Sequence, residues 1–187
     1  MKIACQCGNL QGEITDLTPR VDRHIICCCD DCQAFARFLQ QDGILDASGG
    51  TQIVQMTPSQ IHFSKGESLI ACIRLTPNGV YRWYASCCST PIANTLSSGV
   101  PFMGVIHSII KEPEVVEEIM GPPSMVIQAK HAIVRPLHET QARGFPLSLL
   151  LSTARRLIVA KLKGQDKPNP FFNDKKPLSE PKILSQR

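Results

Sequence analysis

Nine cysteines mark this 187-residue chain, and eight of them fall into three tight groups. The groups lie at residues 5–8 (CQCG), 27–32 (CCCDDC) and 87–91 (CCSTP). Zinc in structural sites takes four ligands in a tetrahedron and prefers thiolate sulfur. A turn with two cysteines supplies two of these ligands, and a second turn from a distant segment completes the site. The clustered thiols therefore predict two zinc sites.

The middle group has the spacing of a three-ligand site, because Cys27, Cys29 and Cys32 come from one short segment. Cys32 lies in the first turn of a predicted helix, whose positive end favours thiolate over thiol. A zinc ion with three protein ligands keeps a fourth position open, as in catalytic sites. A small thiol suits that position, since zinc would hold it as a thiolate at neutral pH. These three cysteines are therefore the candidate catalytic residues.

Two alternatives remain open for these thiols. All of them could be structural ligands, with no catalytic metal among them. Adjacent cysteines do not easily bind one metal ion together, so Cys28 and either Cys87 or Cys88 could be cysteines that bind no metal. Cys72 stands alone in a predicted strand and is expected in the core.

Other polar residues are candidates for supporting roles. His24 and His107 are the histidines expected nearest the metal, as proton shuttle or fourth ligand, or else as ordinary packed side chains. Asp30 and Asp31 precede the apolar face of the predicted helix, and at least one of them is expected to cap it. Alternatively, they orient a ligand or act as a base. Three cations on predicted strands could bind the carboxylates of a glutathione-like thiol: Lys65, Arg74 and Arg82.

Short extended runs separated by turns fill the first hundred residues, which predicts an antiparallel, mainly β fold. The predicted strands are residues 9–15, 21–27, 51–56, 60–64, 68–75, 80–85 and 102–109. The sequence T-P-N-G at 76–79 predicts a hairpin turn. A short helix is predicted after the middle cysteines, because four residues form one apolar face: Cys32, Phe35, Ala36 and Leu39.

The C-terminal part is predicted to hold a second helix at 146–163. Its apolar stripe consists of Leu147, Leu150, Leu151, Ala154 and Ile158. We expect the stripe to pack on the β domain or on a second subunit of a homo-oligomer. Alternatively, the helix lies on an anionic membrane surface with basic residues at its rim. Residues 165–187 are expected to form a poorly ordered tail anchored by Phe171 and Phe172.

The charge distribution argues against some classes of function. The formal net charge is +4, and residues 161–187 alone hold seven basic and three acidic residues. A neutral body with a basic tail is not typical of a nucleic-acid-binding domain.

The most apolar stretch, 145–160, contains two arginines, so no transmembrane segment is predicted. No signal peptide is evident, and the many thiols indicate a reducing compartment, namely the cytoplasm.

The order of the cysteine motifs resembles that of the glutathione-dependent formaldehyde-activating enzyme family. The shared features are C-x-C-G, then C-x-C-x-x-C before a helix, then a late C-(G/S)-T-P, within residues 3–107, with Ser89 where the family usually has glycine. The resemblance implies a β-tent of antiparallel strands with two zinc ions. Cys5, Cys7 and Cys88 match structural ligands, and the middle triad matches the catalytic ones. Ala85 stands where the family has a further cysteine, and Cys87 is the thiol that could replace it.

This resemblance also implies a function. It predicts a zinc-dependent carbon–sulfur lyase of the S-hydroxymethylglutathione synthase type, with a small thiol such as glutathione and an aldehyde such as formaldehyde as partners. The chain would divide into a zinc-binding β-tent domain at 1–110, a C-terminal extension with an amphipathic helix at 111–164, and a basic, proline-containing tail at 165–187. The alternative is a non-catalytic, zinc-stabilised binding module.

Overall fold

Antiparallel strand pairing dominates the structure, which the computed structural model describes for residues 1–16 and 23–184. The strands are β1 (Lys2–Ala4), β2 (Gln11–Ile14), β3 (His24–Cys27), β4 (Thr51–Met56), β5 (Ile61–Lys65), β6 (Ile70–Arg74), β7 (Tyr81–Ala85), β8 (Thr90–Thr95), β9 (Met103–Ile106), β10 (Val126–Ile127), β11 (Phe172–Asn173), β12 (Lys176–Pro177) and β13 (Lys182–Ile183). The α-helices are α1 (Asp30–Leu39), α2 (Pro113–Met120) and α3 (Leu147–Leu162).

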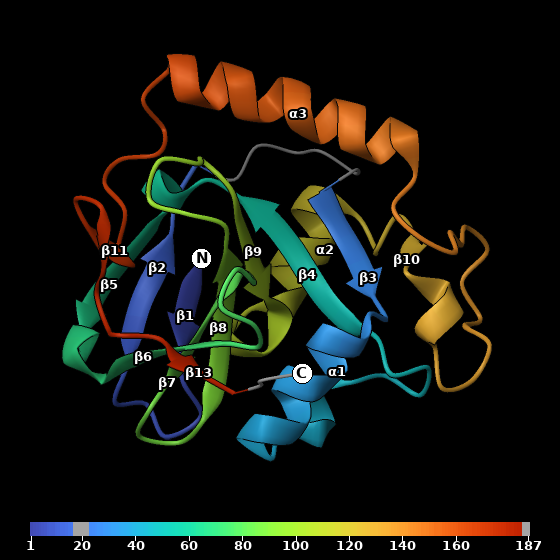
Figure 1. Cartoon of the computed structure of the whole chain (residues 1–187), viewed down its shortest axis with the longest axis horizontal. Helices are drawn as coiled ribbons and strands as arrows, with labels where there is room; N and C mark the ends of the chain where they lie inside the picture. Colours follow the sequence, from blue (N-terminus) through green and yellow to red (C-terminus); the bar gives the residue numbers. More distant parts are fainter. Residues whose placement is uncertain (17–22, 185–187) are drawn as a thin grey trace.

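The strands form one large and two small sheets within the described residues (Figure 1). The large sheet has the order β10-β3-β4-β9-β8-β7-β6-β13, and the small ones are β1-β2-β5 and β11-β12. Only the two edge pairs of the large sheet, β10–β3 and β13–β6, are parallel. The predicted mainly β fold, with a helix after the middle cysteines and another near the C-terminus, is therefore confirmed.

Apolar side chains cover both faces of the large sheet. On one face, Trp83 and Val105 share a core with Ile14 and Ile61 of the small sheet. On the other face, α1 packs Phe35 and other apolar residues against the sheet, as its predicted apolar face requires. The two candidate metal groups therefore belong to a sheet that is packed on both faces, and this close packing restricts the movement of the backbone that carries the cysteines.

Each predicted strand has a counterpart, from β2 through β7 and in β9. The predicted turn closes the β6–β7 hairpin, where the Gly79 amide donates to the Thr76 carbonyl at 3.0 Å. Residues 21 and 22 of one predicted strand lie outside the described residues. The sequence prediction missed β1, β8, α2 and the short strands β10 to β13.

The missed strand β8 is central in the sheet and buried at all six positions. It contains Pro91, a residue that argues against a central strand because proline has no N–H to donate. Pro91 pairs with Tyr84 at the point where the register of β7 shifts, between Trp83 and Tyr84. This local irregularity accommodates the proline and explains why the sequence pattern concealed the strand.

The C-terminal segment anchors itself in the main core. Phe171 stacks on Trp83 with ring centroids 4.9 Å apart, and Phe172 contacts Tyr81 edge-on. The predicted anchor is therefore confirmed. The predicted poor order is wrong for residues 165–184, because the segment forms β11 and β12 and then joins the large sheet as β13.

Helix α3 crosses one edge of the molecule, beyond the ends of the sheet strands (Figure 1). Its buried residues are Leu149 and Ala160, and Arg156 donates to Gln55 Oε1 at 2.6 Å. The predicted packing of the leucine stripe on the β domain is wrong, because every residue of that stripe is exposed. The hydrogen bond between Arg156 on α3 and Gln55 on β4 holds the helix so that the side opposite the leucine stripe faces the sheet.

None of the helices in the described part of the chain has the length and apolar character that crossing a membrane requires.

The packing of Phe171 generates a stability prediction. This ring is fully buried between Trp83 and Phe63, so Phe171→Ala leaves a cavity and should lower the free energy of unfolding by about 3–5 kcal/mol. Urea unfolding at constant metal content measures the change. Phe145→Ala is the matched control, because Phe145 is 53% exposed and its loss should cost at most about 0.5 kcal/mol. Equal losses in the two variants would contradict this role of the C-terminal segment.

Candidate metal centres

Four thiols from the two ends of the first hundred residues form one group. Cys5, Cys7, Cys87 and Cys88 have their sulfur atoms within 4.8 Å of one another. The sulfur of Cys5 is 3.5 Å from that of Cys7 and 3.8 Å from that of Cys87, and the Cys7–Cys87 distance is 3.3 Å. The adjacent pair Cys87 and Cys88 has a separation of 3.8 Å.

These distances fit the corners of a metal site. Thiolates at about 2.3 Å from one metal ion in a tetrahedron lie about 3.8 Å from one another. The sulfur–sulfur distances of 3.3–3.8 Å are close to this value without any side-chain rearrangement. The group could therefore hold a metal ion with all four positions filled by the protein.

Two backbone turns hold the four sulfurs close together. The Leu10 amide donates to Cys5 Sγ at 3.3 Å, and Gly8 takes a left-handed φ of 74° in the turn between them. Ser89 also has a left-handed φ, 57°, immediately after the adjacent cysteines. The Gln6 amide donates to Thr90 Oγ1 at 2.9 Å and ties the two turns together.

Hydrogen bonds prepare Cys88 for metal binding. Partial burial raises the pKa of its thiol, but donation from Thr90 and from backbone amides outweighs burial and lowers the pKa to about 6. The Cys88 sulfur lies 3.0 Å from Thr90 Oγ1. Because metal binding requires the thiolate, this environment reduces the cost of deprotonation.

The middle cysteines form a second group around the start of α1. The sulfurs of Cys27, Cys29 and Cys32 lie within 4.8 Å of one another. Cys27 ends β3 and is held between β4 and β10, while Cys32 lies in the first helical turn. Cys27 and Cys32 are buried and Cys29 is half-buried. This group could also hold a metal ion, and three thiols leave one position of a tetrahedron for another ligand.

The helix cap differs from the prediction. Cys29 is the N-cap of α1, and its sulfur accepts from the Cys32 amide at 3.4 Å. Asp30 instead lies 2.9 Å from the ring of His131, and Asp31 lies 3.5 Å from the guanidinium of Arg82. The predicted capping by Asp30 or Asp31 is therefore wrong, because the sulfur of Cys29 occupies the capping position.

The protons of the triad are unequally shared. Hydrogen bonds from the thiols of Cys27 and Cys29 lower the pKa of Cys32 well below its ordinary value, and Arg82 adds to this effect. The same contacts to Cys29 and Cys32 raise the pKa of Cys27, with burial adding to the rise. A metal ion would replace the protons that the three sulfurs share.

Arg82 brings a buried positive charge to the triad. Its side chain is almost fully buried, and Nη1 lies 3.9 Å from Cys32 Sγ and 3.3 Å from Asn94 Oδ1. The guanidinium also stacks over the ring of Phe35 at 5.6 Å. Three thiolates with one divalent ion carry a net negative charge, which this guanidinium offsets. The sequence indicated Arg82 as a possible carboxylate contact, but its place beside Cys32 depends on the strand register.

Other candidates lie away from the two groups. His24 is buried with Nδ1 3.0 Å from the Gly121 carbonyl, and His107 Nδ1 lies 3.4 Å from the Gln52 carbonyl. Neither histidine joins a candidate metal group among the described residues. The sulfur of Cys28 points to Ser48 at 3.6 Å, and Cys72 is buried in the core as predicted.

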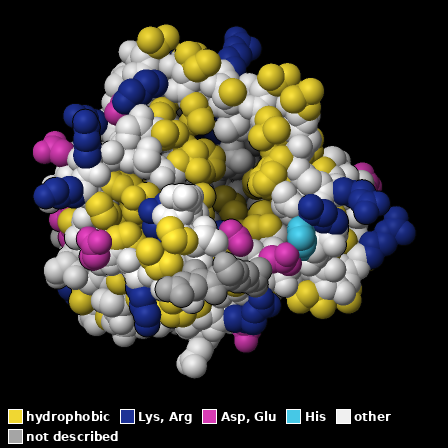
Figure 2. Space-filling model, viewed as in Figure 1, with side chains coloured by type: hydrophobic (Ala, Val, Ile, Leu, Met, Phe, Trp, Pro, Cys, Tyr) yellow, Lys and Arg dark blue, Asp and Glu magenta, His cyan; other side chains and the backbone are white. Residues whose placement is uncertain are grey.

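A cavity of about 540 Å³ lies between α3 and the sheet, where Gln55, Phe102 and Arg156 line it. Figure 2 shows that this face of the molecule is hollowed below α3, and both polar and apolar residues line the cavity. No cysteine lines the cavity. The metal chemistry therefore rests on the sulfur groups themselves.

Comparisons with known proteins identify the family. A model for a family of unknown function, DUF6151, matches residues 1–182. The chain belongs to this family. Among solved structures, a structural-genomics target from Rhodobacter sphaeroides is similar, with 15% identity and a TM-score of 0.46 over 76% of this chain and 99% of that one. A search of curated proteins found no match. The family match spans both cysteine groups.

The number of metal ions per chain should equal the number of intact cysteine groups. The wild-type protein is expected to hold about two metal ions per chain, and Cys87→Ser and Cys29→Ser should each reduce this to about one. Elemental analysis of protein purified without chelator measures the content. Cys72→Ala is the matched control, because this cysteine lies in the core away from both groups. A metal-free wild type, or an equal loss in the control, would contradict the assignment.

Arg82 should stabilise the metal of the triad alone. Arg82→Gln removes the charge beside Cys32 and should weaken metal binding there about tenfold or more, as loss of an outer partner typically does. Chelator competition measures the effect, with the four-thiol group as internal reference. Arg74→Gln is the control, since Arg74 stacks on Tyr81 and donates to the Gly79 carbonyl instead. Unchanged metal release in Arg82→Gln would exclude this role.

Proposed function

We propose that the protein is a zinc enzyme that binds a small thiol such as glutathione and handles its aldehyde adduct. In this proposal Cys27, Cys29 and Cys32 hold the reactive zinc, and the four-thiol group holds a structural one. The cysteine motifs, which resemble those of the glutathione-dependent formaldehyde-activating enzymes, support a carbon–sulfur lyase activity of that type. Nine free thiols are in keeping with a reducing, cytoplasmic setting.

The observation that carries the proposal is the difference between the two cysteine groups. One group offers four sulfurs and can close a tetrahedron, whereas the other offers three. The three-sulfur group also includes Cys29, which remains half-exposed to an incoming ligand. A closed site suits a structural ion, and a site with an open position suits ligand exchange.

The residues around the triad suit a sulfur ligand. Zinc, when bound, supplies the positive charge that keeps an incoming thiol deprotonated at neutral pH. A fourth thiolate adds a second net negative charge, and the buried guanidinium of Arg82 offsets part of it. Apolar residues pack beside Cys27 and Cys32 and reduce the access of water: Ile25, Ile53, Ile127 and Leu149.

The proposed reaction is an addition without oxidation or reduction. The sulfur of the small thiol forms a bond to the aldehyde carbon, and the electron pair of the C=O double bond moves to oxygen. That oxygen takes up the proton that the thiol released, which gives a hydroxyalkyl thioether. The reverse reaction breaks the same C–S bond and frees the aldehyde. The three cysteines would contribute by holding the zinc ion that positions the thiol sulfur for this addition.

Thiol binding can be tested in the cobalt-substituted protein. Glutathione should change the cobalt absorption spectrum, because a new sulfur ligand enters the open position of the triad. S-methylglutathione is the matched control ligand, since it has no free thiol and should leave the spectrum unchanged. Cys29→Ser should abolish the response, while Cys72→Ala should retain it.

The outcomes separate the two classes of function. A spectrum that ignores excess glutathione, or responds equally to S-methylglutathione, would exclude a thiol-binding enzyme and favour the non-catalytic binding module. A selective response supports the enzyme. Formation of the adduct from glutathione and formaldehyde, followed by proton NMR, should then be faster with the wild type than with Cys29→Ser.

A further inference from the structure

The outward side of α3 is an apolar surface with no partner among the described residues. Its large residues are between 49% and 84% exposed. They recur at the spacing of one helix face, since Leu147, Leu151, Ala154, Ile158 and Leu162 follow at intervals of four and three residues. We call this set, together with Leu150, the outer face of α3. An exposed row of this length is unusual for a side that water alone covers.

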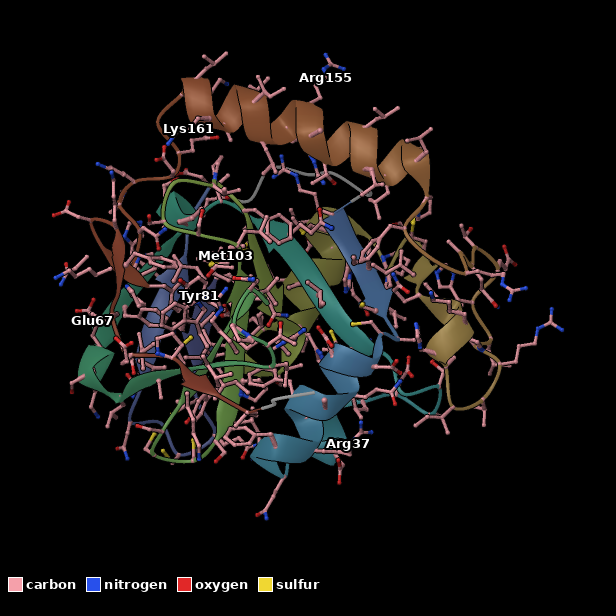
Figure 3. All side chains as sticks on the ribbon, viewed as in Figure 1. Arg37, Glu67, Tyr81, Met103, Arg155 and Lys161 are labelled. Carbon is pink, nitrogen blue, oxygen red and sulfur yellow. The ribbon has the colours of Figure 1, made fainter. Side chains whose placement is uncertain are left out.

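The charged residues of α3 itself are all basic. Thr140 to Gln165 contains no acidic residue and five basic ones: Arg143, Arg155, Arg156, Lys161 and Lys163. Arg155 lies beside the apolar row on the helix and projects away from the sheets (Figure 3). On the other flank, Lys161 extends toward Asp166, with which it pairs at 2.6 Å. Arg155 therefore flanks the apolar row on one side, and on the other side Lys161 lies in an ion pair with Asp166.

The position of α3 suits a flat partner. The helix has 16 residues, or about 24 Å, and lies along one edge of the molecule (Figure 1). Its inward side is anchored by Leu149, Ala160 and the contact between Arg156 and Gln55. The outer face can thus meet a plane along its whole length without any displacement of the helix.

We propose that the outer face of α3 binds the surface of an anionic lipid bilayer, with its leucines among the acyl chains and its flanking cations at the headgroups. An in-plane helix of this kind gains from both apolar burial and attraction to acidic lipids. Pairing of α3 with α3 of a second copy is disfavoured, because it would bring Arg155 toward a helix that has basic residues and no acidic one.

Vesicle sedimentation tests the proposal with the full-length protein. The wild type should co-sediment with vesicles of phosphatidylcholine and phosphatidylserine, and only weakly with phosphatidylcholine alone. Added salt should reduce binding to the acidic vesicles. The double variant Leu151→Asp/Ile158→Asp should bind about tenfold more weakly or not at all.

A matched variant separates the helix face from general charge effects. Ile133→Asp/Leu137→Asp makes the same chemical change at two exposed residues outside α3, and it should keep most of the wild-type binding. Circular dichroism checks that both double variants fold. Failure of the wild type to bind acidic vesicles, or equal loss in the two double variants, would overturn the proposal. A wild-type dimer that only the α3 variant dissociates, without vesicle binding, would assign the face to self-association instead.

Discussion

Convergence of sulfur atoms from distant segments is the constraint on which the rest of the structure depends. Cys5 and Cys7 meet Cys87 and Cys88 only because the N-terminal strand is held from several sides. β1 pairs with β2, Ile3 forms a bridge with Ile110, and the Lys111 amide donates to the Lys2 carbonyl. The opposing turn is fixed by the β7–β8 hairpin. The scaffold thus brings the sulfurs to metal-binding distance, and a bound ion would in turn cross-link the two ends of the scaffold.

The triad depends on a different long-range contact. Its three sulfurs come from one short segment, but the positive charge beside them belongs to Arg82, a residue far along the chain. A guanidinium as deeply buried as that of Arg82 is costly unless negative groups surround it. In this structure those groups are Asp31 and the sulfur of Cys32, while Asn94 accepts a further hydrogen bond. The cation is therefore part of the triad's surroundings, and it would stabilise a metal ion held by the three cysteines. It arrives from β7, some fifty residues further along the chain, through the pairing of the large sheet.

Sequence reasoning succeeded where short-range pattern determines structure. Cysteine spacing located both groups, and strand periodicity located most of the large sheet. It failed where tertiary contacts override local preference. Pro91 concealed a central strand that a register shift accommodates. Asp30 and Asp31 are good capping residues, yet Cys29 takes that position because its sulfur faces the Cys32 amide. No local signal reveals that Arg82 reaches Cys32, since this contact depends on the register of the whole sheet.

Helix α3 shows the same limit and connects the two proposals. Its periodicity predicts an apolar row correctly, but a period cannot tell which side of the helix meets the domain. Leu149, outside the predicted row, is the residue that packs in the apolar cluster of Cys27 and Cys32. The inner side of α3 therefore contributes Leu149 to the apolar cluster beside the triad, whereas its outer face is exposed. The helix that would bind a membrane thus also packs in the cluster that holds two of the cysteines proposed to bind the thiol site's metal.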